Sequence, residues 1–157
     1  MELGYLSQAV GLAVENAAAG ELPFGALVVR NEIVLATGVN TALRDRDPTA
    51  HAEVTAVRSA CRNLGELHLS GASVFSSCEP CAVCHAVAAS VGIDRIFYAA
   101  PKDLVPDLHY PAPHDTDDLA DRMQEALRSA VPGQVVHVST IAADEPFRRY
   151  LTNWGSE

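Results

Sequence analysis

The chain has 157 residues, and its 20 acidic residues against 11 Lys and Arg give a formal net charge of −9. This length suits one domain with its own core, and no apolar run is long enough to cross a bilayer. Because phosphate backbones are bound by clustered positive charge, the charge balance argues against a nucleic-acid partner and favours a small-molecule substrate. The first residues lack the features of a secretory signal, so we expect a cytoplasmic protein.

Helix-like and strand-like patterns alternate through the first hundred residues. Apolar residues recur at helical spacing between Leu3 and Ala17, and short apolar runs between turn residues indicate strands. The predicted elements are a helix ended by Gly20, an antiparallel hairpin of 26–29 with 33–36, a polar loop at 40–48, a helix at 50–64, a strand at 72–76, a helix opening at Pro80 and a strand at 95–98. This order predicts a three-layer α/β/α fold with a mixed five-stranded sheet.

The composition changes after Ala100. Four prolines between Pro101 and Asp118 exclude a long helix and predict a long irregular loop, of the kind that often forms the wall of a site. A helix at 119–127, a strand at 135–138 and a terminal helix from Pro146 follow. The terminal helix carries the apolar stripe Phe147, Tyr150, Leu151 and Trp154. We recognise no repeat, and we predict a single domain over 1–157.

Two short motifs carry the chemistry: His51-Ala52-Glu53 and Pro80-Cys81-Ala82-Val83-Cys84. Pro80 suits the first turn of a helix, which places Cys81 and Cys84 on one face. His51 can join them if the metal lies at the N-terminal end of its own helix. One imidazole and two thiolates leave the fourth tetrahedral position of zinc open for water, which is typical of a catalytic site. We therefore predict that His51, Cys81 and Cys84 bind Zn²⁺.

Glu53 is a carboxylate with no ligand role in this scheme. It can take a proton from the attacking water, pass it to a ring nitrogen and help an amine leave as ammonia. A Cys-x-x-Cys pair alone also occurs in redox proteins and structural zinc sites. Joined to an upstream His-x-Glu, it is the signature of zinc-dependent nucleobase and nucleotide deaminases. Glu53 is thus the predicted catalytic residue.

The motifs also carry a family resemblance. The stretch Asp47-Pro-Thr-Ala-His-Ala-Glu-Val-Thr-Ala-Val-Arg58, with Ser77-Cys-Glu-Pro-Cys-Ala-Val-Cys84, resembles the bacterial guanine deaminase branch of the cytidine deaminase superfamily. The supporting fragments are Pro23-Phe-Gly-Ala, Asn40, Phe97-Tyr-Ala-Ala and Pro146-Phe147. The resemblance covers most of the chain and weakens after Ala100.

The resemblance implies a fold, a site and an assembly. It assigns zinc binding to His51, Cys81 and Cys84, and proton transfer to Glu53. Asn40 then hydrogen-bonds the base, and Phe24 forms a wall of its pocket. The remaining substrate-binding candidates are Ala52, Asp115 and Trp154. The family also implies a homodimer in which the C-terminal segment, about 145–157, crosses to cover the partner's site.

One departure concerns the substrate. Guanine deaminases of this branch place an acidic residue downstream of the second cysteine ligand, where it engages the purine. Ala112 stands at the equivalent spacing here, so Asp115, Asp103 or Asp107 must fill that role if guanine is the substrate. Cytosine, an azacytosine or an amino-s-triazine stays open as an alternative substrate. A tRNA-editing deaminase and a non-catalytic zinc or redox module are the competing functions.

Overall fold

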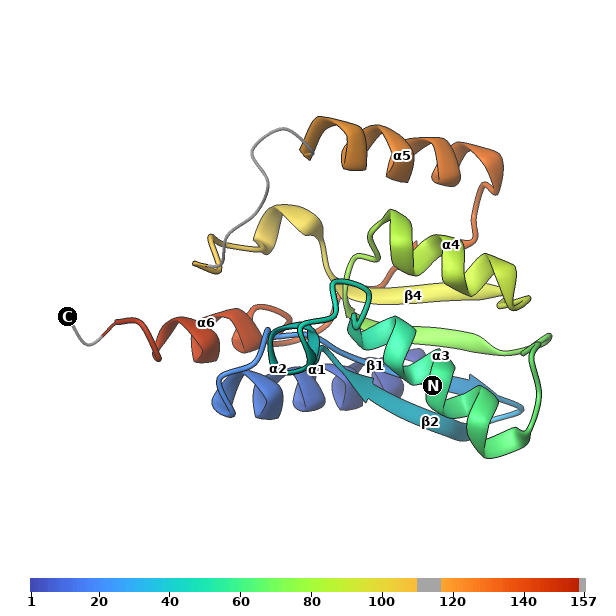
Figure 1. Cartoon of the computed structure of the whole chain (residues 1–157), viewed down its shortest axis with the longest axis horizontal. Helices are drawn as coiled ribbons and strands as arrows, with labels where there is room; N and C mark the ends of the chain where they lie inside the picture. Colours follow the sequence, from blue (N-terminus) through green and yellow to red (C-terminus); the bar gives the residue numbers. More distant parts are fainter. Residues whose placement is uncertain (110–116, 156–157) are drawn as a thin grey trace.

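The computed structural model of the chain describes residues 1–109 and 117–155. Its elements alternate as predicted over the first hundred residues (Figure 1). They are α1 (Glu2–Ala18), β1 (Gly25–Arg30), β2 (Ile33–Val39), α2 (Ala42–Asp45), α3 (Ala52–Leu64), β3 (Ser73–Cys78), α4 (Ala82–Ser90), β4 (Arg95–Ala100), η1 (Lys102–Leu104), α5 (Asp117–Ala130), β5 (Val135–His137) and α6 (Glu145–Leu151).

The strands form one mixed sheet of five strands in the order β2-β1-β3-β4-β5. β1 pairs antiparallel with β2 and with β3, whereas β3 with β4 and β4 with β5 are parallel. The β1–β2 hairpin turns through Asn31 and Glu32, both of which adopt positive φ. The predicted mixed five-stranded sheet is therefore confirmed.

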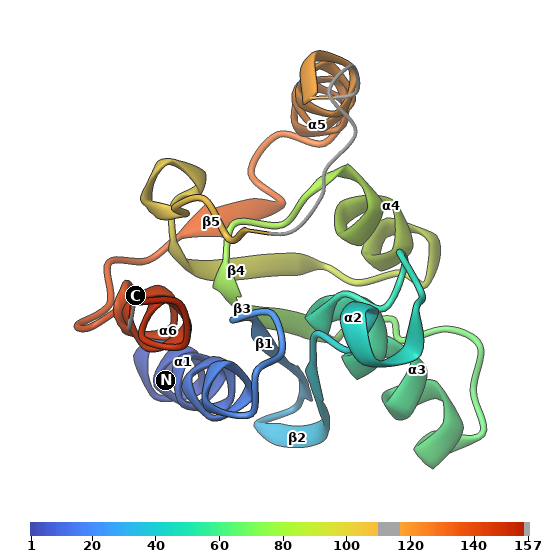
Figure 2. The same cartoon turned by 60° about the vertical axis from the view of Figure 1, so that its left-hand side comes forward.

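Helices cover both faces of the sheet. Figure 2 shows α1 and α6 together on one side and α3 and α4 on the other, and α5 lies against the outer side of α4. Alternate strand residues enter the two cores, as period-two geometry requires. Leu27, Phe75 and Phe97 face α1, whereas Val28 and Val74 face α3 and α4. The predicted α/β/α layering is confirmed.

Two glycines let helices lie directly on strands. A Cβ at Gly25 would stand 2.6 Å from the main-chain oxygen of Ala9, and one at Gly38 would stand 2.4 Å from that of Ala52. The second contact places the start of α3 against β2, next to His51 and Glu53. A side chain at Gly38 would push this helix end away from the sheet.

Several local boundaries differ from the sequence prediction. The predicted polar loop at 40–48 contains the short helix α2, whose first amide is capped by the Asn40 side chain. Helix α4 begins at Ala82, two residues after Pro80, and Cys81 is its N-cap. The segment after Ala100, predicted as an irregular loop, contains the single turn η1, and residues 110–116 of it lie outside the described residues. No helix of the described chain is long and apolar enough to span a membrane.

The C-terminal helix α6 packs against α1 of its own chain. Phe147 and Tyr150 are buried in the core on that side, and Trp154, which lies beyond the end of the helix, is half exposed. The Tyr150 hydroxyl donates a hydrogen bond to the main-chain oxygen of Leu108 at 2.7 Å. The structure describes a single chain, so the crossing of the C-terminal segment onto a partner stays a prediction.

Candidate active site

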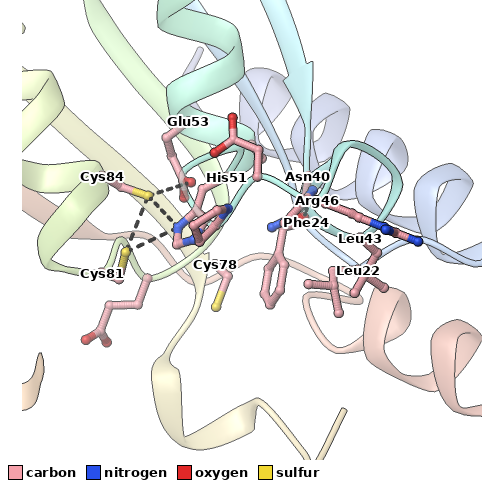
Figure 3. Close-up of a pocket in the computed structure, with 15 residues that line it drawn as sticks. Leu22, Phe24, Asn40, Leu43, Arg46, His51, Glu53, Cys78, Cys81 and Cys84 are labelled. Atoms are coloured by element: carbon pink, nitrogen blue, oxygen red, sulfur yellow. Dashed lines mark hydrogen bonds between the residues drawn. The ribbon is translucent and has the colours of Figure 1, made fainter. Parts of the chain in front are cut away.

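Three side chains that the sequence predicts as ligands meet beyond the carboxyl end of β3 (Figure 3). His51 Nδ1 lies 3.3 Å from Cys84 Sγ and 3.4 Å from Cys81 Sγ, and the two sulfurs are 3.5 Å apart. Tetrahedral zinc, with bonds of about 2.3 Å to sulfur and about 2.0 Å to nitrogen, sets such ligand atoms about 3.5–3.8 Å apart. The donor set and its spacing fit zinc.

Helix ends position all three donors. His51 is the N-cap of α3, with extended φ and ψ of −72° and 156°, so its ring projects off the end of the helix. Cys81 is the N-cap of α4, and Cys84 lies in the first turn of the same helix. Two helix N-termini, each equivalent to roughly half a positive charge, therefore face the site and stabilise thiolates there.

The two sulfurs have different proton affinities before any metal binds. Contact with the Cys84 thiol and a hydrogen bond from His51 lower the pKa of Cys81 to about 4. Contact with Cys81, together with burial and the nearby Glu53 carboxylate, raises the pKa of Cys84. Cys81 is thus a thiolate at neutral pH. A divalent cation must displace the proton of Cys84 to obtain a second thiolate ligand.

Glu53 lies next to the ligands and is only 8% exposed. Its Oε1 accepts a hydrogen bond from Ser76 Oγ at 2.6 Å, and its Oε2 accepts one from Cys84 Sγ at 3.1 Å. Burial raises the pKa of this carboxyl group, while the two hydrogen bonds oppose that rise. A buried carboxyl group with a raised pKa is suited to taking up and giving back a proton.

A cavity of about 580 Å³ opens beside the cluster, and this volume lies within the range of small-molecule sites. Of the predicted residues, it holds the three ligands, Glu53, Phe24, Asn40 and Ala52. The sequence did not single out the other lining residues, which are Leu22, Ala42, Leu43, Arg46, Asp47, Pro48, Cys78 and Glu79. Most of them come from α2 and its flanks, a segment whose polar composition indicated only a loop.

Asn40 is held in one orientation. Its Oδ1 accepts the main-chain N–H of Ala42 at 3.0 Å, which identifies the other end of the amide as Nδ2. Within the described residues, no group accepts a hydrogen bond from Nδ2. Since Asn40 is 4% exposed and lines the cavity, this donor is available to a ligand. A ligand group beside Asn40 must therefore be a hydrogen-bond acceptor.

Phe24 forms an apolar wall of the cavity. Its ring meets that of Phe147 edge-on, with centroids 6.0 Å apart, so α6 supports this wall from behind. The adjacent Gly25 N–H donates to Ser77 Oγ at 3.0 Å, which fixes the start of β1. The Phe24 ring is thus supported by α6.

The remaining candidates lie elsewhere. Asp115 is outside the described residues. Asp103 and Asp107 are exposed, and neither lines the cavity. Trp154 packs near His109, with ring centroids 5.3 Å apart, and does not reach the cavity of its own chain. Its predicted role in a partner's site stays a prediction.

Residues 2–100 match the model of the cytidine and deoxycytidylate deaminase zinc-binding region, and this match covers well over half of the chain. The chain belongs to this family. As a member of the cytidine and deoxycytidylate deaminase family it has a zinc-binding domain, and His51, Cys81 and Cys84 supply the donors that such a metal needs.

Relatives with assigned functions differ in what they act on. The chain is 43% identical over 99 residues to the guanine deaminase of Bacillus subtilis, a stretch that spans 62% of this chain and 58% of that protein. It is 33% identical over 81 residues to the tRNA-specific adenosine deaminase of Aquifex aeolicus, over 52% of this chain and 54% of the relative. The matched part thus spans little more than half of these curated relatives.

Solved structures share the fold more widely. The crystal structure of Bacillus subtilis guanine deaminase superposes with a TM-score of 0.61 and 31% identity, over 82% of this chain and 94% of that one. The structure of a guanine deaminase from Nitrosomonas europaea superposes with a TM-score of 0.71 at 23% identity, over 94% of this chain and 83% of that one. At this identity the likeness shows the fold alone. The family and the α/β fold predicted from the motifs are confirmed.

Proposed function

We propose that this chain hydrolyses the exocyclic amino group of a free nucleobase, guanine or a related amino-substituted base, and releases ammonia. The observation that carries the proposal is the buried Glu53 carboxylate, 3.1 Å from a predicted zinc ligand, at the edge of a cavity of about 580 Å³. The cavity is large enough for a base, and its walls include Leu22, Phe24 and Leu43. These apolar side chains favour the flat face of an aromatic ring.

Residues around the cavity divide the chemical work. His51, Cys81 and Cys84 would hold zinc, whose Lewis acidity makes water nucleophilic near neutral pH. In the proposed reaction, Glu53 Oε2 takes a proton from the attacking water and gives it to the ring nitrogen beside the carbon that bears the amine. Glu53 then carries the second proton of that water, from the hydroxyl group now on the carbon, to the amine. The carbon–nitrogen bond breaks, ammonia leaves, and a carbonyl group remains on the ring.

Asn40 and Phe24 bind the base in this proposal. The fixed Nδ2 donor of Asn40 selects a ring that presents a carbonyl oxygen or an unprotonated nitrogen at that edge. Phe24 offers its ring as a wall, and the Ala52 main chain lies between the ligand His51 and the proton carrier Glu53. Guanine, cytosine, azacytosines and amino-s-triazines all carry an acceptor beside an amine.

Guanine is our first choice because the relative at 43% identity is a guanine deaminase. The acidic residue that this substrate requires has no assigned position, since Asp103 and Asp107 lie away from the cavity and Asp115 is outside the described residues. Cytosine, azacytosines and amino-s-triazines carry the same amine beside a hydrogen-bond acceptor. They therefore belong in the same substrate panel.

A tRNA-editing deaminase is the second candidate, because tRNA-specific adenosine deaminases are also relatives. The charge of the chain argues against this candidate. The formal net charge is −9, and Arg46 is the one Lys or Arg that lines the described cavity. Binding an anticodon stem would require phosphate contacts whose strength falls steeply with salt. Salt-sensitive RNA binding, with retention of nucleic acid on purification, would favour this candidate.

The homodimer implied by the resemblance remains part of the proposal. A partner's C-terminal segment over the cavity would exclude water from the reacting carbon, and that arrangement gives Trp154 its predicted role. The measurement is the molar mass of the zinc-loaded protein in solution. A mass of two chains supports the dimer, and a monomer that releases ammonia contradicts it.

The test of the function is ammonia release by the zinc-loaded protein from guanine, cytosine, 5-azacytosine and amino-s-triazines. We expect release from at least one of them. No release from any free base, with release from an anticodon stem-loop, would transfer the assignment to tRNA editing. Bound zinc without turnover on either class would indicate a binding module, and four free thiols without zinc would indicate a redox module.

A further inference from the structure

We propose that Ser76 is a positioning residue, which fixes one oxygen of the Glu53 carboxylate so that only the other can move protons. Because Glu53 moves protons only if the chain is a deaminase, this role rests on the proposed function. Ser76 is not part of either sequence motif. It lies four residues before Pro80, inside the strand that leads to the cysteine ligands.

The contact is short and buried. Ser76 is 1% exposed in the central strand β3, and its Oγ lies 2.6 Å from Glu53 Oε1. This separation is in the range of about 2.5–2.7 Å that is typical of a hydroxyl hydrogen bond to a carboxylate. Since Glu53 is itself only 8% exposed, water has little access to replace the hydroxyl group.

A second hydrogen bond sets the direction of the first. The main-chain N–H of Cys78 points at Ser76 Oγ, at 3.4 Å, and occupies an acceptor position of that oxygen. A hydroxyl group has one hydrogen to donate. With Cys78 N–H as donor on one side, the Ser76 hydrogen is directed at Glu53 Oε1. Ser76 is therefore the donor, and Glu53 Oε1 the acceptor, in this bond.

The two carboxylate oxygens are thereby made unequal. Oε1 is tied to β3, whereas Oε2 lies 3.1 Å from Cys84 Sγ, on the side of the predicted ligands. Rotation about the last bond of a glutamate side chain is soft, so an untied carboxylate samples a broad range of angles. The Ser76 bond removes this freedom and keeps Oε2 toward the place where water and substrate meet.

The chain supplies a matched control in the next residue. Ser77 is also 1% exposed in β3, but its Oγ accepts a hydrogen bond from Gly25 N–H at 3.0 Å. Successive strand residues point to opposite faces of a sheet, so Ser77 points away from Glu53. Removing either hydroxyl group leaves a buried partner without a hydrogen bond. Only the change at Ser76 removes a hydrogen bond from Glu53, the proposed proton carrier.

The kinetic test compares zinc-loaded wild type with Ser76→Ala, Ser77→Ala and Ser76→Thr, using the base that the wild type deaminates. We expect Ser76→Ala to lower kcat by about 10–100-fold, as for other groups that orient a catalytic residue, with KM unchanged. Ser77→Ala should keep the wild-type kcat, and Ser76→Thr should recover most of it. Equal kcat in Ser76→Ala and wild type, or equal losses in both alanine variants, would overturn the proposal.

A second measurement does not depend on turnover. In zinc-loaded protein labelled with ¹³C-glutamate, the Cδ resonance of Glu53 is identified by its loss in Glu53→Gln. Ser76→Ala should shift this resonance, and Ser77→Ala should leave it in place. A resonance unmoved by Ser76→Ala overturns the role of Ser76 even if the enzyme is active. A shifted resonance in a protein that deaminates nothing would overturn the proposed function alone. Ser76→Cys replaces Ser76→Ala if the alanine variant does not fold.

Discussion

The side-chain amide of Asn16 donates a hydrogen bond to the main-chain oxygen of Asn40 at 2.8 Å, and another to that of Leu22 at 2.8 Å. Asn16 lies on α1, on the opposite side of the sheet from the predicted zinc ligands, and is 8% exposed. One buried amide thus holds both segments that bring Asn40 and Phe24 to the cavity. The layer that contains α1 takes part in shaping the site through this residue.

Asn16→Ala removes both bonds. The buried Asn40 oxygen then has no hydrogen-bond donor among the described residues, whereas the Leu22 oxygen keeps the Phe24 N–H at 2.9 Å. We expect the free energy of unfolding to fall by about 1–3 kcal/mol, and KM for the base to rise because Asn40 and Phe24 lose their support. Urea denaturation and steady-state kinetics measure the two effects. Asn63→Ala is the control, since Asn63 donates to the Leu35 oxygen and neither residue lines the cavity. A KM raised equally in both variants would contradict this role of Asn16.

Asn40→Asp tests the donor without changing the shape of the side chain. The remaining Oδ1 still caps Ala42, but Nδ2 is replaced by an oxygen that cannot donate. We expect kcat/KM to fall by about 5–150-fold, the equivalent of about 1–3 kcal/mol for an unpaired buried group. An unchanged kcat/KM would show that the base makes no hydrogen bond with this amide.

Gln124 on α5 braces the turn that precedes the first cysteine ligand. Its Nε2 donates to the Pro80 oxygen at 2.7 Å and to Glu79 Oε2 at 3.1 Å. Gln124→Ala should therefore weaken zinc binding, by about 10-fold or less, in a chelator competition. The control is Arg122→Ala, which removes an exposed side chain of the same helix. Equal zinc affinity in the two variants would show that the Gln124 side chain does not contribute to zinc binding.

Tyr150→Phe tests how α6 is held in its own chain. The variant loses the buried hydrogen bond to the Leu108 oxygen, and we expect it to be less stable by about 1–2 kcal/mol in urea. Tyr5→Phe is the control, because Tyr5 makes the same kind of bond to the Glu32 oxygen at an exposed place. A stability loss as small as that of Tyr5→Phe would mean that the Leu108 bond adds nothing.

The sequence predicted best what depends on periodicity and on motif chemistry. The hairpin, the long helices and the mixed sheet follow from apolar spacing, and the ligands from residue types whose chemistry has few other uses. Helix α2 was missed because its four residues are too few for a periodic pattern, and it starts where the Asn40 side chain caps it.

Side chains that act through distant partners left no signal in the sequence. Ser76 and Ser77 are identical neighbours in a buried strand, and only the fold assigns one to Glu53 and the other to Gly25. Gln124 on α5 reaches Pro80 across 44 positions. Such contacts depend on tertiary packing, which no local pattern encodes.

Glu53→Gln tests whether Glu53 moves the protons of the proposed zinc-dependent deamination. Glutamine keeps the size of the side chain and a hydrogen-bond acceptor for Ser76, but it cannot exchange a proton at neutral pH. The measurement is ammonia release per bound zinc, in wild type and variant loaded to the same metal content. We predict a fall of about 10²–10⁴-fold with zinc still bound. A Glu53→Gln protein that releases ammonia at the wild-type rate would contradict the account.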